Sequence, residues 1–111
     1  MTNPNELADL IYAGALEWVP RGGGIGEVER DGASVLIYGR RPGLLRPFTQ
    51  QQTCVEAIIT EADVRAIVLG GRPGIPHNVE LFSLPVADRP ASELADDVVA
   101  RISNYLAATT S

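Results

Sequence analysis

Two short runs of this 111-residue chain carry apolar side chains at successive positions, and they limit the fold more than any other feature. Residues 35–37 read Val-Leu-Ile, and residues 64–69 read Val-Arg-Ala-Ile-Val-Leu, which is apolar apart from Arg65. Successive side chains of a β-strand point to opposite faces of the sheet, so both runs would be apolar on two faces. We expect both strands to lie inside a sheet, covered by helices of the same chain or by a second subunit.

The length of the chain fits a single domain, residues 1–111. Hydrophobic residues make up 45% of the sequence, which allows a core without disulfides or metals. Aromatic residues are only 5%, so we expect that core to be aliphatic.

Helices are predicted at both ends of the chain. The first, residues 4–16, follows Asn3, a residue favoured at the N-cap, and has Pro4 at its first position. The second, residues 91–106, places its apolar side chains on one stripe: Leu94, Ala95, Val98, Val99, Ile102, Tyr105 and Leu106.

Strands are predicted over residues 25–30, 33–38, 64–69 and 78–86. Asp31-Gly32 is a two-residue turn signal, so the first two strands should form a hairpin. Pro85 marks the end of the last strand or an edge of the sheet, because proline cannot donate to a neighbouring strand.

The middle segment, residues 49–62, fits two structures. A strand would bury the alternating side chains Val55, Ala57 and Ile59. A helix would bury the stripe Cys54, Val55, Ile58, Ile59 and Ala62. The capping-box pattern of residues 49–52 favours the helix. The predicted fold is therefore α+β, in the order α-β-β-α-β-β-α, with an antiparallel sheet of about four strands, helices at both termini and one helix in the middle.

Charge and cysteine content narrow the possible partners. The net charge of −5 argues against nucleic acid, whose phosphates would be repelled. All nine basic residues are arginine, which suggests a GC-rich bacterial genome. The single cysteine, Cys54, suits a reducing compartment. Since no signal-peptide pattern and no apolar run of about 20 residues occurs, we expect a cytoplasmic protein without a membrane partner.

Arginines supply the main candidate for a binding site. Arg40, Arg41 and Arg46 lie in one turn-rich stretch, and Arg72 follows a later strand in a similar Arg-Pro-Gly turn. Guanidinium groups bind carboxylates and phosphates well, so these four side chains predict an anion-binding or partner-binding patch. Alternatively, they are solvated and paired with some of the 14 acidic residues.

The remaining candidates point away from catalysis. The glycine-rich stretch of residues 22–26 follows a helix and enters a strand, the reverse of a phosphate-binding loop. His77 has no nucleophile or metal ligand near it in sequence, and Cys54 is expected to be a buried structural thiol. Glu27, Glu29 and Asp31 alternate along a strand and could line one face; paired carboxylates can act as acid and base, but alternating acids on an exposed strand are usually solvated. No metal, cofactor or catalytic set is therefore predicted.

Trp18 ends the first helix, just before Pro20. It is expected either to pack into the core or, if exposed, to anchor an interface with another protein.

The order of elements resembles that of the small acidic secretion chaperones that serve type III export. The resemblance covers the terminal helices, the middle helix over residues 49–62 and the strand pairs, together with size and acidity. It implies a cytoplasmic, dimeric α/β sandwich that binds another protein. The chain has one predicted strand fewer before the middle helix than such chaperones have.

These patterns favour a non-enzymatic adaptor or chaperone-like domain, a homodimer that binds another protein or an extended peptide on a sheet face or edge. A second hypothesis is a small-molecule or anion binder, or a small enzyme, with its site between subunits. A third is a structural subunit of a larger complex.

Overall fold

The computed structural model describes residues 3–21, 24–40, 53–70, 77–87 and 89–110. Helix α1 spans Pro4–Trp18, the short 3-10 helix η1 spans Val19–Arg21, and helix α2 spans Ala91–Thr110. The strands between them are β1 (Ile25–Asp31), β2 (Ser34–Gly39), β3 (Cys54–Ile59), β4 (Asp63–Gly70) and β5 (Val79–Pro85). None of the helices in these described ranges is long and apolar enough to cross a membrane.

The five strands form one antiparallel sheet in which each strand lies beside the strand that precedes it in sequence. The prediction of an α+β fold with terminal helices is confirmed. The predicted number of strands is wrong, because the sheet has five strands and β3 occupies the centre, with two strands on either side.

The predicted middle helix is wrong where the structure describes that segment. Cys54–Ile59 form β3, which pairs with β2 on one side and with β4 on the other. Val55, Ala57 and Ile59 are buried, as the strand interpretation required. Pairing on both sides satisfies the backbone groups of this segment, and that outweighs its helical spacing. The capping-box residues 49–52 lie outside the described residues.

The predicted hairpin between β1 and β2 is present, but its turn lies one residue later than expected. Asp31 pairs with Ser34, so Gly32 and Ala33 form the turn. Gly32 has a φ of 61°, whereas Ala33 is not among the residues with positive φ. Glycine at the first central position is the pattern of a type II′ turn, which matches the twist of the two strands.

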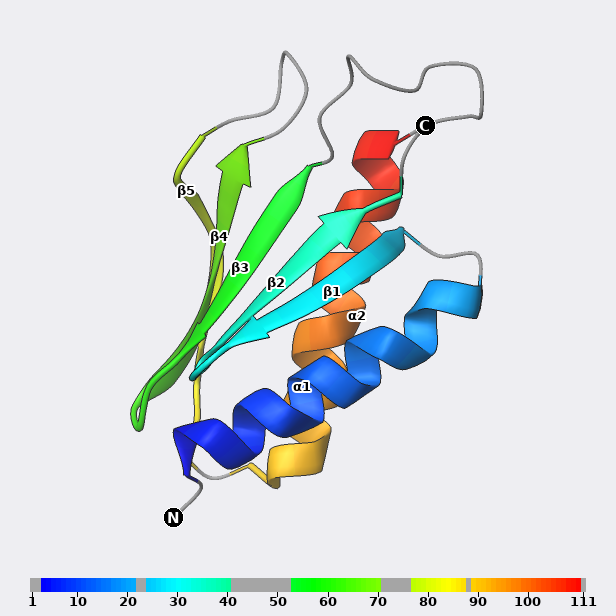
Figure 1. The fold of residues 1–111 in the computed structure, drawn as a ribbon. Helices are drawn as coiled ribbons and strands as arrows, with labels where there is room; N and C mark the ends of the chain where they lie inside the picture. Colours follow the sequence, from blue (N-terminus) through cyan, green and yellow to red (C-terminus); the bar gives the residue numbers. More distant parts are fainter. Residues whose placement is uncertain (1–2, 22–23, 41–52, 71–76, 88, 111) are drawn as a thin grey trace.

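Both helices lie against the same face of the sheet (Figure 1). Their buried side chains meet the inward-facing side chains of the strands in one aliphatic core; the largest include Leu7, Ile11, Ile37, Leu94, Ile102 and Leu106. The helices also pack against each other, and a Cβ at Gly14 of α1 would make an ordinary contact of 3.5 Å with Val99 Cγ2 of α2. The second face of the sheet therefore has no helix over it within the described residues.

Candidate binding surface

The uncovered side of the sheet, here called the open face, carries the second set of apolar side chains that the sequence predicted. They alternate with the core residues along the strands and are half-buried: Leu36, Tyr38, Ile58, Ile67 and Leu69. The charged side chains of this face include Glu27, Glu29, Glu56, Arg65 and Glu80, and Asp31 and Asp63 lie on the same face at strand ends. The open face thus combines apolar side chains with charged side chains, most of which are acidic.

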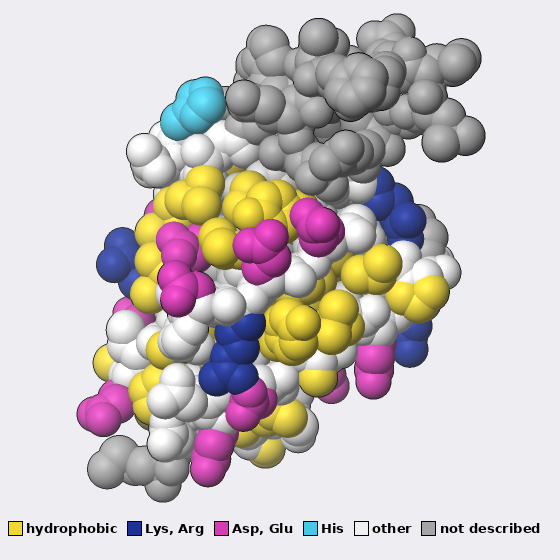
Figure 2. All heavy atoms as spheres, viewed as in Figure 1, with side chains coloured by type: hydrophobic (Ala, Val, Ile, Leu, Met, Phe, Trp, Pro, Cys, Tyr) yellow, Lys and Arg dark blue, Asp and Glu magenta, His cyan; other side chains and the backbone are white. Residues whose placement is uncertain are grey.

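The strand register places five of these side chains in one row across the sheet. Glu29 pairs with Leu36, Leu36 with Glu56, Glu56 with Ile67, and Ile67 with Glu80. Directly paired residues on one face have Cβ atoms about 5 Å apart. Each apolar side chain of the row therefore lies between two carboxylates. Figure 2 shows acidic side chains among hydrophobic ones over the strands.

Most carboxylates of the open face lack a positive partner among the residues that the structure describes. Glu27, Glu29 and Glu56 make no ion pair with any residue that the structure describes. Arg65 contributes positive charge to this face, but its Nε lies 2.9 Å from Glu80 Oε1. The negative charge of the open face is therefore incompletely neutralised by these residues.

Tyr38 and Cys54 form a polar contact at one end of this face. They pair across β2 and β3, and the side chain of each influences the pKa of the other. Burial, followed by the nearby charge of Glu56, raises the pKa of the Cys54 thiol to about 11. Burial, with Cys54, Glu29 and Glu27 nearby, also raises the pKa of Tyr38. Cys54 is therefore protonated at neutral pH, as a structural thiol is, although it lies on a strand rather than on the predicted helix.

The predicted arginine patch falls largely outside the described residues, which exclude Arg41, Arg46 and Arg72. Arg40 is half-buried at the end of β2. Its guanidinium donates a hydrogen bond to the Val19 carbonyl, and its backbone N–H donates to the Gly24 carbonyl at 3.0 Å. Arg40 therefore ties the segment after α1 to β2, and the patch as a whole stays a prediction.

The glycine-rich stretch has a packing role at the one buried glycine that the structure describes there. A Cβ on Gly24 would lie 2.3 Å from the backbone nitrogen of Ala107 and 2.6 Å from the carbonyl oxygen of Ser103, both on α2. Gly24 thus lets the chain contact the backbone of α2. This packing explains why the position is a glycine, with no need for a bound ligand. Gly22 and Gly23 lie outside the described residues.

His77 lies beside a strand end rather than among catalytic groups. A Cβ on Gly70 would lie 2.2 Å from His77 Nδ1, so the imidazole packs against the bare backbone of Gly70. The φ of 125° at Gly70 also favours glycine. Within the described ranges, no three His, Cys, Asp or Glu side chains form a group that would hold a metal ion.

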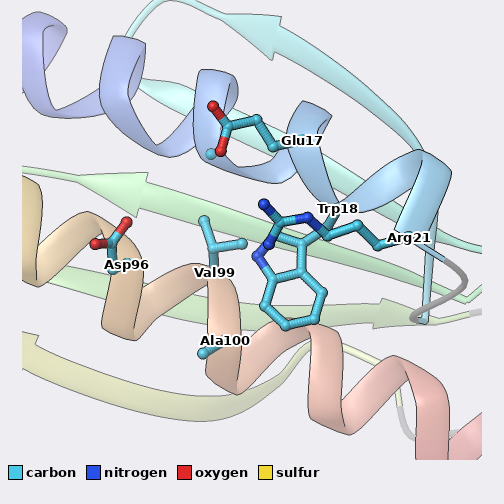
Figure 3. Close-up of a pocket in the computed structure, with 7 residues that line it drawn as sticks. Glu17, Trp18, Arg21, Asp96, Val99 and Ala100 are labelled. Atoms are coloured by element: carbon cyan, nitrogen blue, oxygen red, sulfur yellow. The ribbon is translucent and has the colours of Figure 1, made fainter.

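Trp18 lies in a pocket between the two helices, on the side away from the sheet (Figure 3). Its ring is half-buried against the core, and the Arg21 guanidinium carbon lies 5.8 Å from the ring centroid. The pocket, of about 320 Å³, is lined by Gly14, Glu17, Trp18, Arg21, Asp96, Val99 and Ala100. Both roles predicted for Trp18, core packing and interface contact, are compatible with this position.

The sequence pattern did not point to Glu56, and it assigned Ile58 to a buried helical stripe, because a helix was favoured for the segment that became β3. Ile67 belonged to a run that was correctly predicted as a strand with two apolar faces. Strand alternation over residues 54–59 was the signal that would have placed Glu56 and Ile58 opposite the buried residues. No known protein family, curated protein or solved structure matches this chain.

Proposed function

We propose that this chain is a non-enzymatic binding domain, an adaptor or chaperone-like protein, that binds another protein on its open face. The observation that carries the proposal is the placement of both helices on one face, which leaves Leu36, Tyr38, Ile58, Ile67 and Leu69 half-buried on the other. Fully burying an aliphatic side chain contributes about 1.5–3 kcal/mol relative to its exposed state. These five side chains are already half-buried, so a partner that covers them would gain the part of that stabilisation that corresponds to their remaining exposed area.

Secretion chaperones are one class of such proteins, and the size and acidity of the chain are in keeping with them. However, the middle helix that this resemblance implied is replaced by β3 over residues 54–59. The proposal therefore concerns protein binding, with export chaperones as one instance of it.

A homodimer is the second candidate, because another copy would also cover the open face. The expectation came from strands that are apolar on two faces, and the described helices cover one of those faces. Sedimentation velocity of the purified chain at micromolar concentration tests it: a single species of monomer mass rules the homodimer out.

Partner capture from the source cells, quantified by mass spectrometry, tests the open face. The bait variant Ile58→Ser/Ile67→Ser removes apolar area from this face and leaves the core side chains in place. The matched control, Leu10→Ser/Leu16→Ser, changes exposed aliphatic side chains of α1. We expect a discrete protein that the wild type and the control retain and the open-face variant loses.

Two results would contradict the proposal. One is a partner that is lost from the α1 control and retained by the open-face variant, which would place binding on the helices. The other is turnover of a substrate by the purified chain. Circular dichroism of both variants must first show wild-type secondary structure.

A further inference from the structure

We infer that the open face takes a basic amphipathic segment of a partner protein, in which aliphatic residues are interspersed with arginine or lysine. This inference rests on the proposed function, and it adds the chemistry of the partner. It is drawn from the pattern of charge on the face and from the position of one carboxylate near its centre.

The charge of the open face calls for a cationic partner. Glu27, Glu29 and Glu56 have no ion pair within the described part of the chain, and the Arg65 guanidinium is already beside Glu80. An apolar partner would remove these carboxylates from water without compensation, which is costly. A partner with guanidinium or ammonium groups would instead form charge-assisted hydrogen bonds to them.

The spacing of the row fits a segment that carries both kinds of side chain. Acidic positions alternate with apolar ones from Glu29 through Leu36, Glu56 and Ile67 to Glu80. Neighbouring strands are about 4.8 Å apart, so successive acidic positions are about 10 Å apart. Residues seven apart on a helix are also about 10 Å apart, at a rise of about 1.5 Å per residue. A helix crossing the strands with a basic residue every seventh position and aliphatic residues between would match the row.

A second copy of the chain is a poor match to the same face. Glu56 lies on β3, the central strand, and therefore near the middle of the open face. A two-fold axis there would bring the Glu56 carboxylates of two copies together. Among the described residues, Arg65 is the cation of this face that could offset the two Glu56 charges, but it already forms an ion pair with Glu80. Face-to-face packing of two copies would thus bury like charges.

Selection from a library of random 16-residue peptides against the immobilised full chain tests this inference. Enriched peptides are resynthesised, and their Kd is measured by calorimetry. We expect them to carry net positive charge with aliphatic residues between the basic ones. The Kd should rise severalfold between 50 and 500 mM salt, because salt screens charge pairs at a surface.

Two pairs of substitutions locate the effect. Glu29→Gln/Glu56→Gln should weaken binding of the enriched peptides about tenfold. The control Glu17→Gln/Asp96→Asn changes the net charge by the same amount at the helix pocket. It should leave the Kd within about twofold, which separates the open face from a general effect of charge.

The outcomes separate this inference from the proposed function. The enriched peptides could instead be neutral or acidic, with a Kd that Glu29→Gln/Glu56→Gln leaves unchanged and that Ile58→Ser/Ile67→Ser raises. That result would contradict the basic chemistry of the partner but would still support binding on the open face. If no peptide is enriched, or if neither open-face variant changes the Kd, the proposal that the open face is the binding surface is wrong.

Discussion

Tyr38 and Cys54 pair across β2 and β3, and strand alternation places the Cys54 thiol on the same face of the sheet as Glu56. Because burial opposes the charged thiolate, the pKa of Cys54 rises to about 11 from the usual value of 9.0.

The folded state holds the thiol proton more tightly than the unfolded state does. The resulting stabilisation is present below pH 9 and is lost as the pH rises through about 11. We expect the Tm to fall between pH 9 and pH 11, and to fall less in Cys54→Ala. Scanning calorimetry from pH 8 to pH 11 measures both. Equal slopes in the two proteins would show that the thiol does not contribute.

Asp97 of α2 should give the opposite dependence on pH. Its Oδ1 lies 2.7 Å from Arg101 Nε and its Oδ2 lies 3.0 Å from Arg89 Nη1. These hydrogen bonds, first that of Arg101, lower the pKa of the Asp97 carboxyl. Its stabilisation is therefore present above the unfolded-state pKa of about 3.9 and is lost as the pH falls further.

We expect Asp97→Asn to lower the free energy of unfolding by about 0.5–1 kcal/mol at pH 7, since these are surface interactions. The difference from the wild type should shrink below pH 4. Urea denaturation at pH 7 and pH 3 measures it. A difference that is unchanged at pH 3 would show that the charge of Asp97 is not the cause.

Adjacent residues of β3 distinguish the observed strand from the helix that the sequence favoured. Ile59 is buried at 4% exposure, whereas Ile58 is half-buried on the open face. We expect Ile59→Ser to lower the free energy of unfolding by about 3 kcal/mol or more, and Ile58→Ser by about 1 kcal/mol or less. On a helix both side chains would share one stripe, so equal losses in chemical denaturation would support the helix.

Two glycines next to α2 should respond to alanine in opposite ways. A Cβ at Gly14 meets Val99 Cγ2 at an ordinary 3.5 Å, and alanine favours a helix over glycine by about 1 kcal/mol. We expect Gly14→Ala to raise the Tm and Gly24→Ala to lower stability by about 1–3 kcal/mol, because its Cβ would overlap the backbone of α2. Thermal unfolding of both variants checks this, and a neutral Gly24→Ala would show that the segment can move away.

Local sequence signals were sufficient to predict the two terminal helices. Asn3 accepts a hydrogen bond from the Asn5 backbone at 2.8 Å, and Pro4 begins α1, as predicted. The stripe from Leu94 to Leu106 is buried along α2, apart from Tyr105, which is half-buried. These features depend on neighbours in sequence, so a cap or a periodic stripe is enough to predict them.

The open face required information that the sequence does not contain. Residues 64–69 showed that a strand had two apolar faces, but not which face the helices would cover. That was decided when both helices packed on the side of Val35, Ile37 and Val55. The row of Glu29, Leu36 and Glu56 depends further on the register of three strands.

What the sequence determined by itself is the aliphatic core, the terminal helices, the first hairpin and the strands that are apolar on two faces. What only the tertiary structure decided is that the middle segment is β3 and that its Glu56 lies near the centre of an uncovered face. The physical reason is that a strand obtains its backbone hydrogen bonds from distant segments, whereas a helix obtains them from its own turns. A segment with both periodicities therefore takes its structure from the strands beside it.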